Sequence, residues 1–272
     1  MSLNFFRPWA AVLALLFLPS SSFAHGDLHE SIEAVSRVIA RAPGDASMWL
    51  RRAELYRQHK DLRAAEADYA KAGELDPRLD AVGLGLARLR LAQGRERDAL
   101  GLLDGFIAKQ PDHAEGRALR AEILERRGSW KKADADLAAA VAASTEPHFV
   151  TQRAQLLERH GQPEAAARCL DEASKRRGRL PVLEQHALDI EERAGLTDAA
   201  LRRLEFFAGC EPRPDIWLAR TARLLGKAGR GAEAREAWGK AAAAFEKIPA
   251  ARRSLAANRK LGAEIAAGNS PK

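Results

Sequence analysis

The feature that most constrains this sequence is a pattern of small residues that returns every 34 residues, with one step of 33. The first column of the pattern holds Ala53, Ala87, Ala121, Ala154, Leu188 and Ala222, and the second holds Ala65, Ala99, Ala133, Ala166, Ala200 and Ala234. A glycine column lies between them, at Gly94, Gly128, Gly161, Gly195 and Gly229, with Lys60 in the same place of the first copy. A fixed period of this size indicates a solenoid, in which each unit buries its apolar face only by stacking on its neighbours.

The first copy, residues 46–79, predicts a hairpin of two antiparallel helices. Its apolar stripes have helical spacing and consist of Trp49, Ala53 and Tyr56, followed by Ala65, Tyr69 and Ala72. Residues 58–61 between the stripes are polar and predict a turn, and Pro77 ends the second helix. A small residue is needed where the two helices cross, because only a small side chain lets the backbones approach closely.

These columns resemble the consensus of the tetratricopeptide repeat family. Six copies can be placed, at residues 46–79, 80–113, 114–146, 147–180, 181–214 and 215–248. The resemblance implies an all-α solenoid, a right-handed superhelix whose first helices line a concave groove for a peptide or helix of a partner protein. Some positions depart from the consensus: Arg90 and Glu191 stand in the Tyr56 column, and Arg117 and Glu184 in the Trp49 column. We therefore expect altered packing of the first helix in those repeats.

Both ends of the array are expected to carry a capping helix. Residues 25–45 match the second half of a repeat, through Ser31, Val35, Val38 and Pro43. Residues 249–272 predict a basic amphipathic helix and a short tail, with Leu255, Leu261 and Ile265 on the inner side. Solenoids need such caps to cover their terminal apolar surfaces.

Residues 1–24 have the features of a secretory signal peptide. Arg7 supplies a positive start, residues 9–18 form an uncharged apolar run, and Ser22 and Ala24 are the small residues that precede cleavage. We expect cleavage after Ala24 and a periplasmic or secreted protein. The alternative is an uncleaved anchor, but ten helical residues span only about 15 Å of a ~30 Å hydrocarbon core.

Charge and cysteine content exclude some classes of function. The chain has a net charge of +7, but no run of like charges, and a secretory signal disfavours nucleic acid as a partner. Cys169 and Cys210 fall on second helices at different heights, so we expect two thiols rather than a disulfide. The sequence also predicts no insertion into a membrane and a monomeric chain.

The repeat phase predicts which side chains face the groove. These are Glu54, Arg57, Arg88, Glu122, Arg126, Gln155, Arg159, Gln185, Asp189, Arg193 and Arg223. Three repeats place a Glu–Arg pair at the same height, at residues 125–126, 158–159 and 192–193. Such pairs suit an extended peptide held by charge-assisted hydrogen bonds; the alternative is a solvated face with weak internal ion pairs. The family's lysine–asparagine clamp for a C-terminal carboxylate is not expected, because Leu50 and Glu54 stand at those positions.

Two other functions compete with the scaffold hypothesis. Cleavage after Ala24 would leave His25 at the N-terminus, where its imidazole, the free amine and His29 could chelate copper; the alternative is an ordinary exposed helix start at Asp27. An unrecognised envelope enzyme is the other competitor, although the sequence has no HExxH, GK[ST] loop, GxSxG or CxxC motif. The sequence thus favours a non-catalytic assembly factor or scaffold of the bacterial cell envelope, without a cofactor, that binds a protein or peptide.

Overall fold

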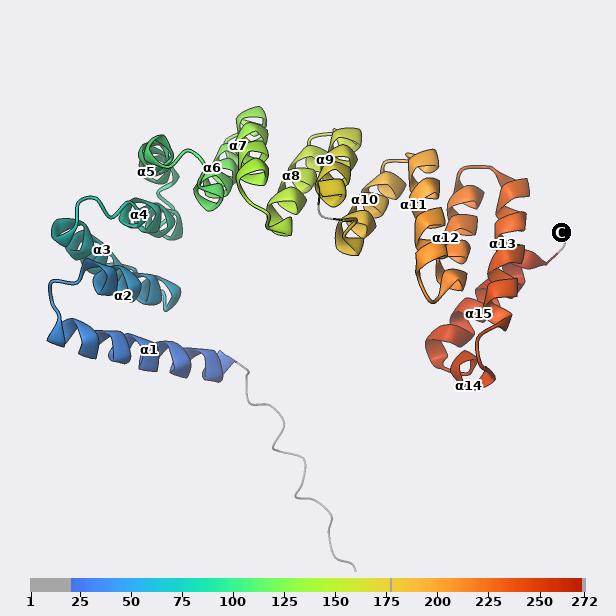
Figure 1. The fold of residues 1–272 in the computed structure, drawn as a ribbon, viewed down its shortest axis with the longest axis horizontal. Helices are drawn as coiled ribbons and strands as arrows, with labels where there is room; N and C mark the ends of the chain where they lie inside the picture. Colours follow the sequence, from blue (N-terminus) through green and yellow to red (C-terminus); the bar gives the residue numbers. More distant parts are fainter. Residues whose placement is uncertain (1–20, 177, 271–272) are drawn as a thin grey trace, which may run out of the picture. The chain divides into compact units, whose positions relative to one another are not determined.

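The computed structural model describes residues 21–176 and 178–270, with the backbone alone for residues 21–27. All regular structure in these ranges is helical (Figure 1). The helices are α1 (Ser21–Arg41), α2 (Ala46–Gln58), α3 (Leu62–Leu75), α4 (Ala81–Ala92), α5 (Glu96–Lys109), α6 (Ala114–Arg126), α7 (Trp130–Ala143), α8 (Pro147–Arg159), α9 (Pro163–Arg176), α10 (Pro181–Arg193), α11 (Thr197–Cys210), α12 (Pro214–Lys227), α13 (Gly231–Glu246), α14 (Ala250–Arg253) and α15 (Ala256–Asn269). The chain forms two compact units, one ending at Gly116 and the other beginning at Arg117.

Within each unit, the two small-residue columns lie where paired helices cross. In the first unit, Ala53 of α2 and Ala65 of α3 are fully buried in one cluster with Tyr69. In the second unit, Ala121 of α6 and Ala133 of α7 are buried together in the same way. The tight crossing explains the period, because a larger side chain at these points would push the two backbones apart. The all-α solenoid fold expected from the sequence is confirmed.

The glycine column lies in the turns between first and second helices. Gly94 has a φ of 74°, and the other glycines of the column have φ values between 69° and 76°. This left-handed conformation ends a helix and is natural for glycine, which has no Cβ to clash. Lys60 adopts the same conformation, with a φ of 65°, and therefore carries backbone strain that the glycines avoid.

Helix α1 packs on α2, and its buried face consists of Ile32, Val35 and Ile39. The predicted match of Val38 to the buried second-helix column is wrong, because Val38 is 44% exposed. Among the described residues, no first helix precedes α1 to cover this side of it. The helix begins at Ser21, so Asp27 lies within it and does not start it. Most of the predicted signal peptide, residues 1–20, lies outside the described residues.

The C-terminal segment forms two helices, α14 and α15, where the sequence predicted one. Leu255, expected on the inner side, is 59% exposed, because its extended backbone joins the two helices. Ile265 is buried against α13, and Leu261 packs at the edge of the same cluster. Within the described range, no helix combines the length and apolarity that crossing a bilayer requires.

Candidate functional site

In the first unit, the predicted groove residues form one ion-pair network around Glu54 of α2. Arg57 donates from Nε and Nη2 to Glu54 Oε2, at 3.0 and 2.9 Å. Tyr69 of α3 donates its hydroxyl to Glu54 Oε1 at 2.7 Å, and burial together with this bond raises the pKa of Tyr69. Arg88 of α4 lies 3.5 Å from Glu54 and also pairs with Glu115 of α6. The network therefore ties α2, α3, α4 and the start of α6 together.

In the second unit, the first helices are joined by a ladder of ion pairs. Arg159 of α8 donates to both oxygens of Glu125 on α6, at 2.9 and 2.8 Å. Arg193 of α10 binds Glu158 of α8 in the same bidentate way, at 2.8 and 3.1 Å. Each arginine thus pairs with the glutamate of the preceding repeat, not with the glutamate beside it in the sequence. These contacts hold the Arg159 and Arg193 guanidinium groups in fixed positions.

The last rung of this first-helix ladder uses an arginine that the sequence reasoning missed. Arg220 of α12 donates to both oxygens of Glu192, at 2.8 Å each, and to Asp189 Oδ1 at 2.6 Å. Gln185 also donates to Asp189 Oδ1, at 3.0 Å. Arg220 lies outside the column of Arg159 and Arg193, so the repeat phase gave no signal for it.

The other predicted groove residues have different surroundings. Arg126 pairs with Glu122 within α6, at 2.7 Å. Arg223 of α12 lies 3.2 Å from Glu264 of α15, which connects the last repeat to the C-terminal helix. Gln155 is exposed on α8, the helix that also carries Glu158 and Arg159 of the ladder. The ladder and the Arg223 contact are therefore separate groups in the second unit.

The ladder arginines keep unused donors. The side chains of Arg159 and Arg193 are 55% and 57% exposed. A guanidinium has five N–H groups, and a bidentate contact through Nε and Nη2 occupies two of them. Hydrogen bonds from Arg159 lower the pKa of Glu125, so this acid stays ionised and keeps its partner oriented. Nη1 of each arginine remains available to a ligand.

An aromatic contact extends the ladder at its first rung. His160 stacks on Trp130 of α7, with ring centroids 5.0 Å apart and planes 7° from parallel. The same imidazole lies 3.3 Å from Glu125. The surface around Glu125 therefore combines a fixed guanidinium with a flat aromatic face.

Three of the four departures from the repeat consensus, Arg117, Glu184 and Glu191, take part in buried ion pairs between first and second helices. Arg90 instead pairs with the partly exposed Glu66. Arg117 and Arg120 of α6 both bind Asp136 of α7, which is buried; Arg120 makes two bonds of 2.7 Å. In the first repeat, Arg52 binds the buried Asp68 at 2.6 and 2.9 Å. A charge at an aromatic position thus comes with an opposite charge on the facing helix.

The fifth repeat holds the largest of these groups, with Arg203 of α11 at its centre. Arg203 is 9% exposed and donates to Glu191 at 2.9 Å twice, to Glu184 at 2.5 Å and to Asp171 of α9 at 2.6 Å. Glu184 also accepts from Ser174, at 2.9 Å. Burial lowers the pKa of Arg203, but the bonds to Glu191 and Asp171 outweigh it and raise the pKa. We call these four charged residues the Arg203 cluster.

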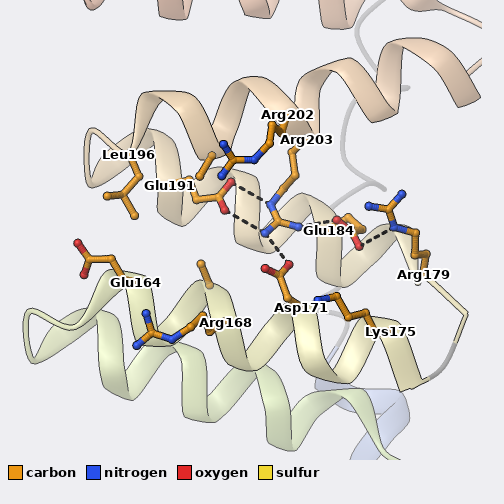
Figure 2. A pocket seen from close by; sticks show the side chains of 12 residues that line it. Glu164, Arg168, Asp171, Lys175, Arg179, Glu184, Glu191, Leu196, Arg202 and Arg203 are labelled. Atoms are coloured by element: carbon orange, nitrogen blue, oxygen red, sulfur yellow. Dashed lines mark hydrogen bonds and ion pairs between the residues drawn. The ribbon is translucent and has the colours of Figure 1, made fainter.

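The Arg203 cluster forms one wall of a cleft between α9, α10 and α11 (Figure 2). The cleft has a volume of about 420 Å³, within the range of ligand pockets. Its remaining lining is basic and apolar: Arg168, Lys175, Arg179, Arg202, Ala167, Leu196, Ala199 and one acid, Glu164. We call it the α9–α11 cleft. The sequence reasoning missed it, because its residues come from three helices of two repeats.

The histidine and cysteine predictions have separate outcomes. His29 lies on α1, 3.3 Å from Glu33, while the side chain of His25 falls outside the described residues. No group of three or more potential metal ligands occurs in the described part of the chain. Cys169 is buried and Cys210 exposed, and both are free thiols, as expected.

Comparisons with known proteins identify the repeats. Residues 56–123 and residues 21–79 each match a family model described as tetratricopeptide repeat. A curated protein of Pseudomonas fluorescens, cellulose synthase operon protein C, is 33% identical over 84 residues, or 31% of this chain. The chain spans only 7% of that protein's length.

Solved structures share the fold at low sequence identity. The C-terminal part of a repeat protein from Cytophaga hutchinsonii has a TM-score of 0.58 at 12% identity, over 86% of this chain and 96% of that one. PilW, titled a type IV pilus biogenesis factor, has a TM-score of 0.54 at 17% identity, over 70% and 89%. PilF of Pseudomonas aeruginosa has a TM-score of 0.50 at 15% identity, over 81% and 97%. These likenesses concern the fold alone.

Proposed function

Because the chain is a tetratricopeptide repeat protein, we propose that it is a non-catalytic scaffold or assembly factor of the bacterial cell envelope. Its first-helix ladder would bind an extended segment of a partner protein. The observation that carries this proposal is the bidentate fixing of Arg159 and Arg193 by acids of the preceding repeat. A fixed donor loses less entropy on binding than a free side chain does.

The charge of the ladder indicates which part of the partner it would bind. Glu125 and Glu158 neutralise the two arginines, so the ladder offers N–H donors without a large positive field. Neutral acceptors suit such donors better than strong anions do. The carbonyl oxygens of an extended peptide recur along its length, and the ladder repeats along the first helices. We therefore propose backbone recognition, with the flat face of Trp130 and His160 as an additional contact.

The envelope location is proposed from the sequence of the first 24 residues. A cleaved leader would place the scaffold in the periplasm or outside the cell. Intact mass of the chain from a periplasmic fraction tests this part of the proposal. A mass that begins at His25 is expected, and a full-length chain in the membrane pellet would contradict it.

The binding proposal is tested by replacing three exposed arginines of the first helices. We expect Arg126→Ala, Arg159→Ala and Arg193→Ala together to reduce the amount of partner captured from envelope extract by about tenfold or more, since charge-assisted hydrogen bonds are lost. Quantitative mass spectrometry of the captured proteins provides the measurement.

A matched control variant changes three exposed basic residues of second helices. Arg63→Ala, Arg97→Ala and Arg235→Ala remove the same charge from α3, α5 and α13. This variant should capture the same partners as the unmodified chain. We call the triple variant Arg126→Ala, Arg159→Ala, Arg193→Ala the ladder variant. If it captures as much partner as the unmodified chain does, the partner site lies elsewhere.

A further inference from the structure

The α9–α11 cleft has the features of a second binding site, on a different set of side chains from the first-helix ladder. We propose that it binds an acidic segment of a partner protein, with one carboxylate between Arg168 and Arg202. This proposal does not depend on the function proposed for the ladder. It rests on the donors of the cleft, its charge and the shape of its lining (Figure 2).

The free hydrogen-bonding capacity of the cleft consists almost entirely of donors. Arg168, Lys175 and Arg202 are exposed and make no ion pair with another described residue. The two buried acids, in contrast, are occupied: Glu191 gives both oxygens to Arg203, and Glu184 gives one to Arg203 and one to Ser174. Asp171 gives one oxygen to Arg203, and Glu164 is an exposed acid of the lining. A ligand that enters the cleft therefore meets unpaired cationic donors, which bind an anionic acceptor best.

The two arginines at the mouth occupy equivalent places in successive repeats. Arg168 lies on α9 and Arg202 on α11, on the two sides of the cleft in Figure 2. The planar guanidinium fork matches the geometry of a carboxylate. Arg179, in the loop before α10, is held 4.1 Å above the ring of Phe206 and 3.7 Å from Glu184. Its position is thus set before any ligand binds.

The rest of the lining favours a peptide over a phosphate group. Ala167, Leu196 and Ala199 give the cleft an apolar part of its lining that an aliphatic side chain would cover. Five basic and four acidic side chains line the cleft, so its net charge is only +1. A single carboxylate, with a charge of −1, matches this net charge.

The test measures binding of a fluorescein-labelled decapeptide of alternating Glu and Leu to the full chain by fluorescence anisotropy. We expect Arg168→Ala with Arg202→Ala to weaken binding at least tenfold. We also expect binding to weaken between about 20 and 500 mM NaCl, because salt screens exposed charges. Unchanged affinity of this double variant would overturn the proposal.

The chain offers a matched control for this double variant. Arg63→Ala with Arg97→Ala removes two exposed arginines that are also one repeat apart, on α3 and α5, and should leave the affinity unchanged. The ladder variant Arg126→Ala, Arg159→Ala, Arg193→Ala should also bind the decapeptide normally, which separates this test from that of the proposed function. Equal binding of a Gln–Leu decapeptide, or displacement of the Glu–Leu peptide by inorganic phosphate but not by acetate, would overturn recognition of a peptide carboxylate.

Discussion

The α9–α11 cleft of the second unit has a counterpart in the first unit, between α3, α4 and α5. The two clefts lie between equivalent sets of three helices, share three equivalent lining positions and have similar volumes, about 420 and 460 Å³. Their linings differ. Three repeats apart, Gly83, Gly101 and Leu102 of the first cleft correspond to Glu184, Arg202 and Arg203 of the second. At these three positions the first cleft has small or apolar residues, whereas the second has charged ones. The charged residues of the first cleft, Asp76, Asp80 and Lys109, lie at other positions.

The comparison shows that the repeat fixes the backbone around the cleft but not its chemistry. The helix crossings use alanine in both units, with Leu188 as the exception in the first column, because the short crossing distance favours a small side chain. The side chains between two second helices are less constrained. A charged group is tolerated there when its partner charges are present, since burying an unpaired ion costs several kcal/mol.

The largest effect is expected from removing the centre of the charged cluster. Arg203→Met should lower the free energy of unfolding by about 3–5 kcal/mol, because it leaves Glu191 buried without a counter-charge and Glu184 with only the exposed Arg179, 3.7 Å away. Urea unfolding followed by circular dichroism measures this loss. A loss below 1 kcal/mol would show that the cluster is open to water.

The apolar lining of the first cleft provides the control for that experiment. Arg203→Leu, Glu184→Ala and Glu191→Leu together remove the cation and the two buried acids that bind it. This variant should recover most of the lost stability, because apolar replacements of buried ion pairs are often neutral or stabilising by about 1–4 kcal/mol. If it is as unstable as Arg203→Met, the cluster contributes packing that apolar residues cannot replace.

In the fourth repeat, Cys169 occupies the column that holds Asp68, Asp136 and Arg203 in other repeats. It therefore shows how an uncharged side chain behaves at this buried position. Burial raises the pKa of its thiol to about 11. At pH 8 only about 0.1% would be thiolate, compared with roughly a quarter for a free thiol of pKa about 8.5. We expect Ellman's reagent to modify the exposed Cys210 at least 100 times faster than Cys169. Equal rates would mean that α9 opens readily.

Some of the features compared in the two units could be predicted from the sequence. Every small-residue column and turn glycine could be predicted, because each repeat contains the same helix crossing and the same turn at the end of its first helix. The Arg203 cluster could not be predicted, because its charges come from three helices and interrupt the periodicity. The available signal was opposite charge: Glu184 and Glu191 replace aromatic residues where Arg203 stands in the column of Asp68 and Asp136. The recurrence of Glu and Arg at one height could be predicted, but not that each arginine binds the glutamate of the preceding repeat, because that contact joins two repeats.

Placing the charge of the second cleft in the first should have a smaller effect. Leu102→Arg introduces a cation without the buried acids that surround Arg203. Leu102 is only half-buried, so the long side chain can extend toward solvent. We expect a loss of about 1–2 kcal/mol, measured by urea unfolding. Leu102→Met is the control and should stay within about 0.5 kcal/mol. A loss as large as that of Arg203→Met would contradict our expectation that the first cleft tolerates a charge at position 102.

The smallest expected effect concerns the turn that both units use. Lys60 adopts a φ of 65° where Gly94, in the next repeat, has 74°. A left-handed residue other than glycine costs about 1–2 kcal/mol, but glycine also gives the unfolded chain more freedom. Lys60→Gly should therefore raise the free energy of unfolding by at most about 1 kcal/mol. Gly94→Ala is the reverse experiment and should lower it by about 1 kcal/mol, since nothing lies within 4 Å of the added Cβ and only backbone strain acts. If Lys60→Gly destabilises the chain, the lysine must make a compensating contact, and the two units would differ in their turns as well as in their clefts.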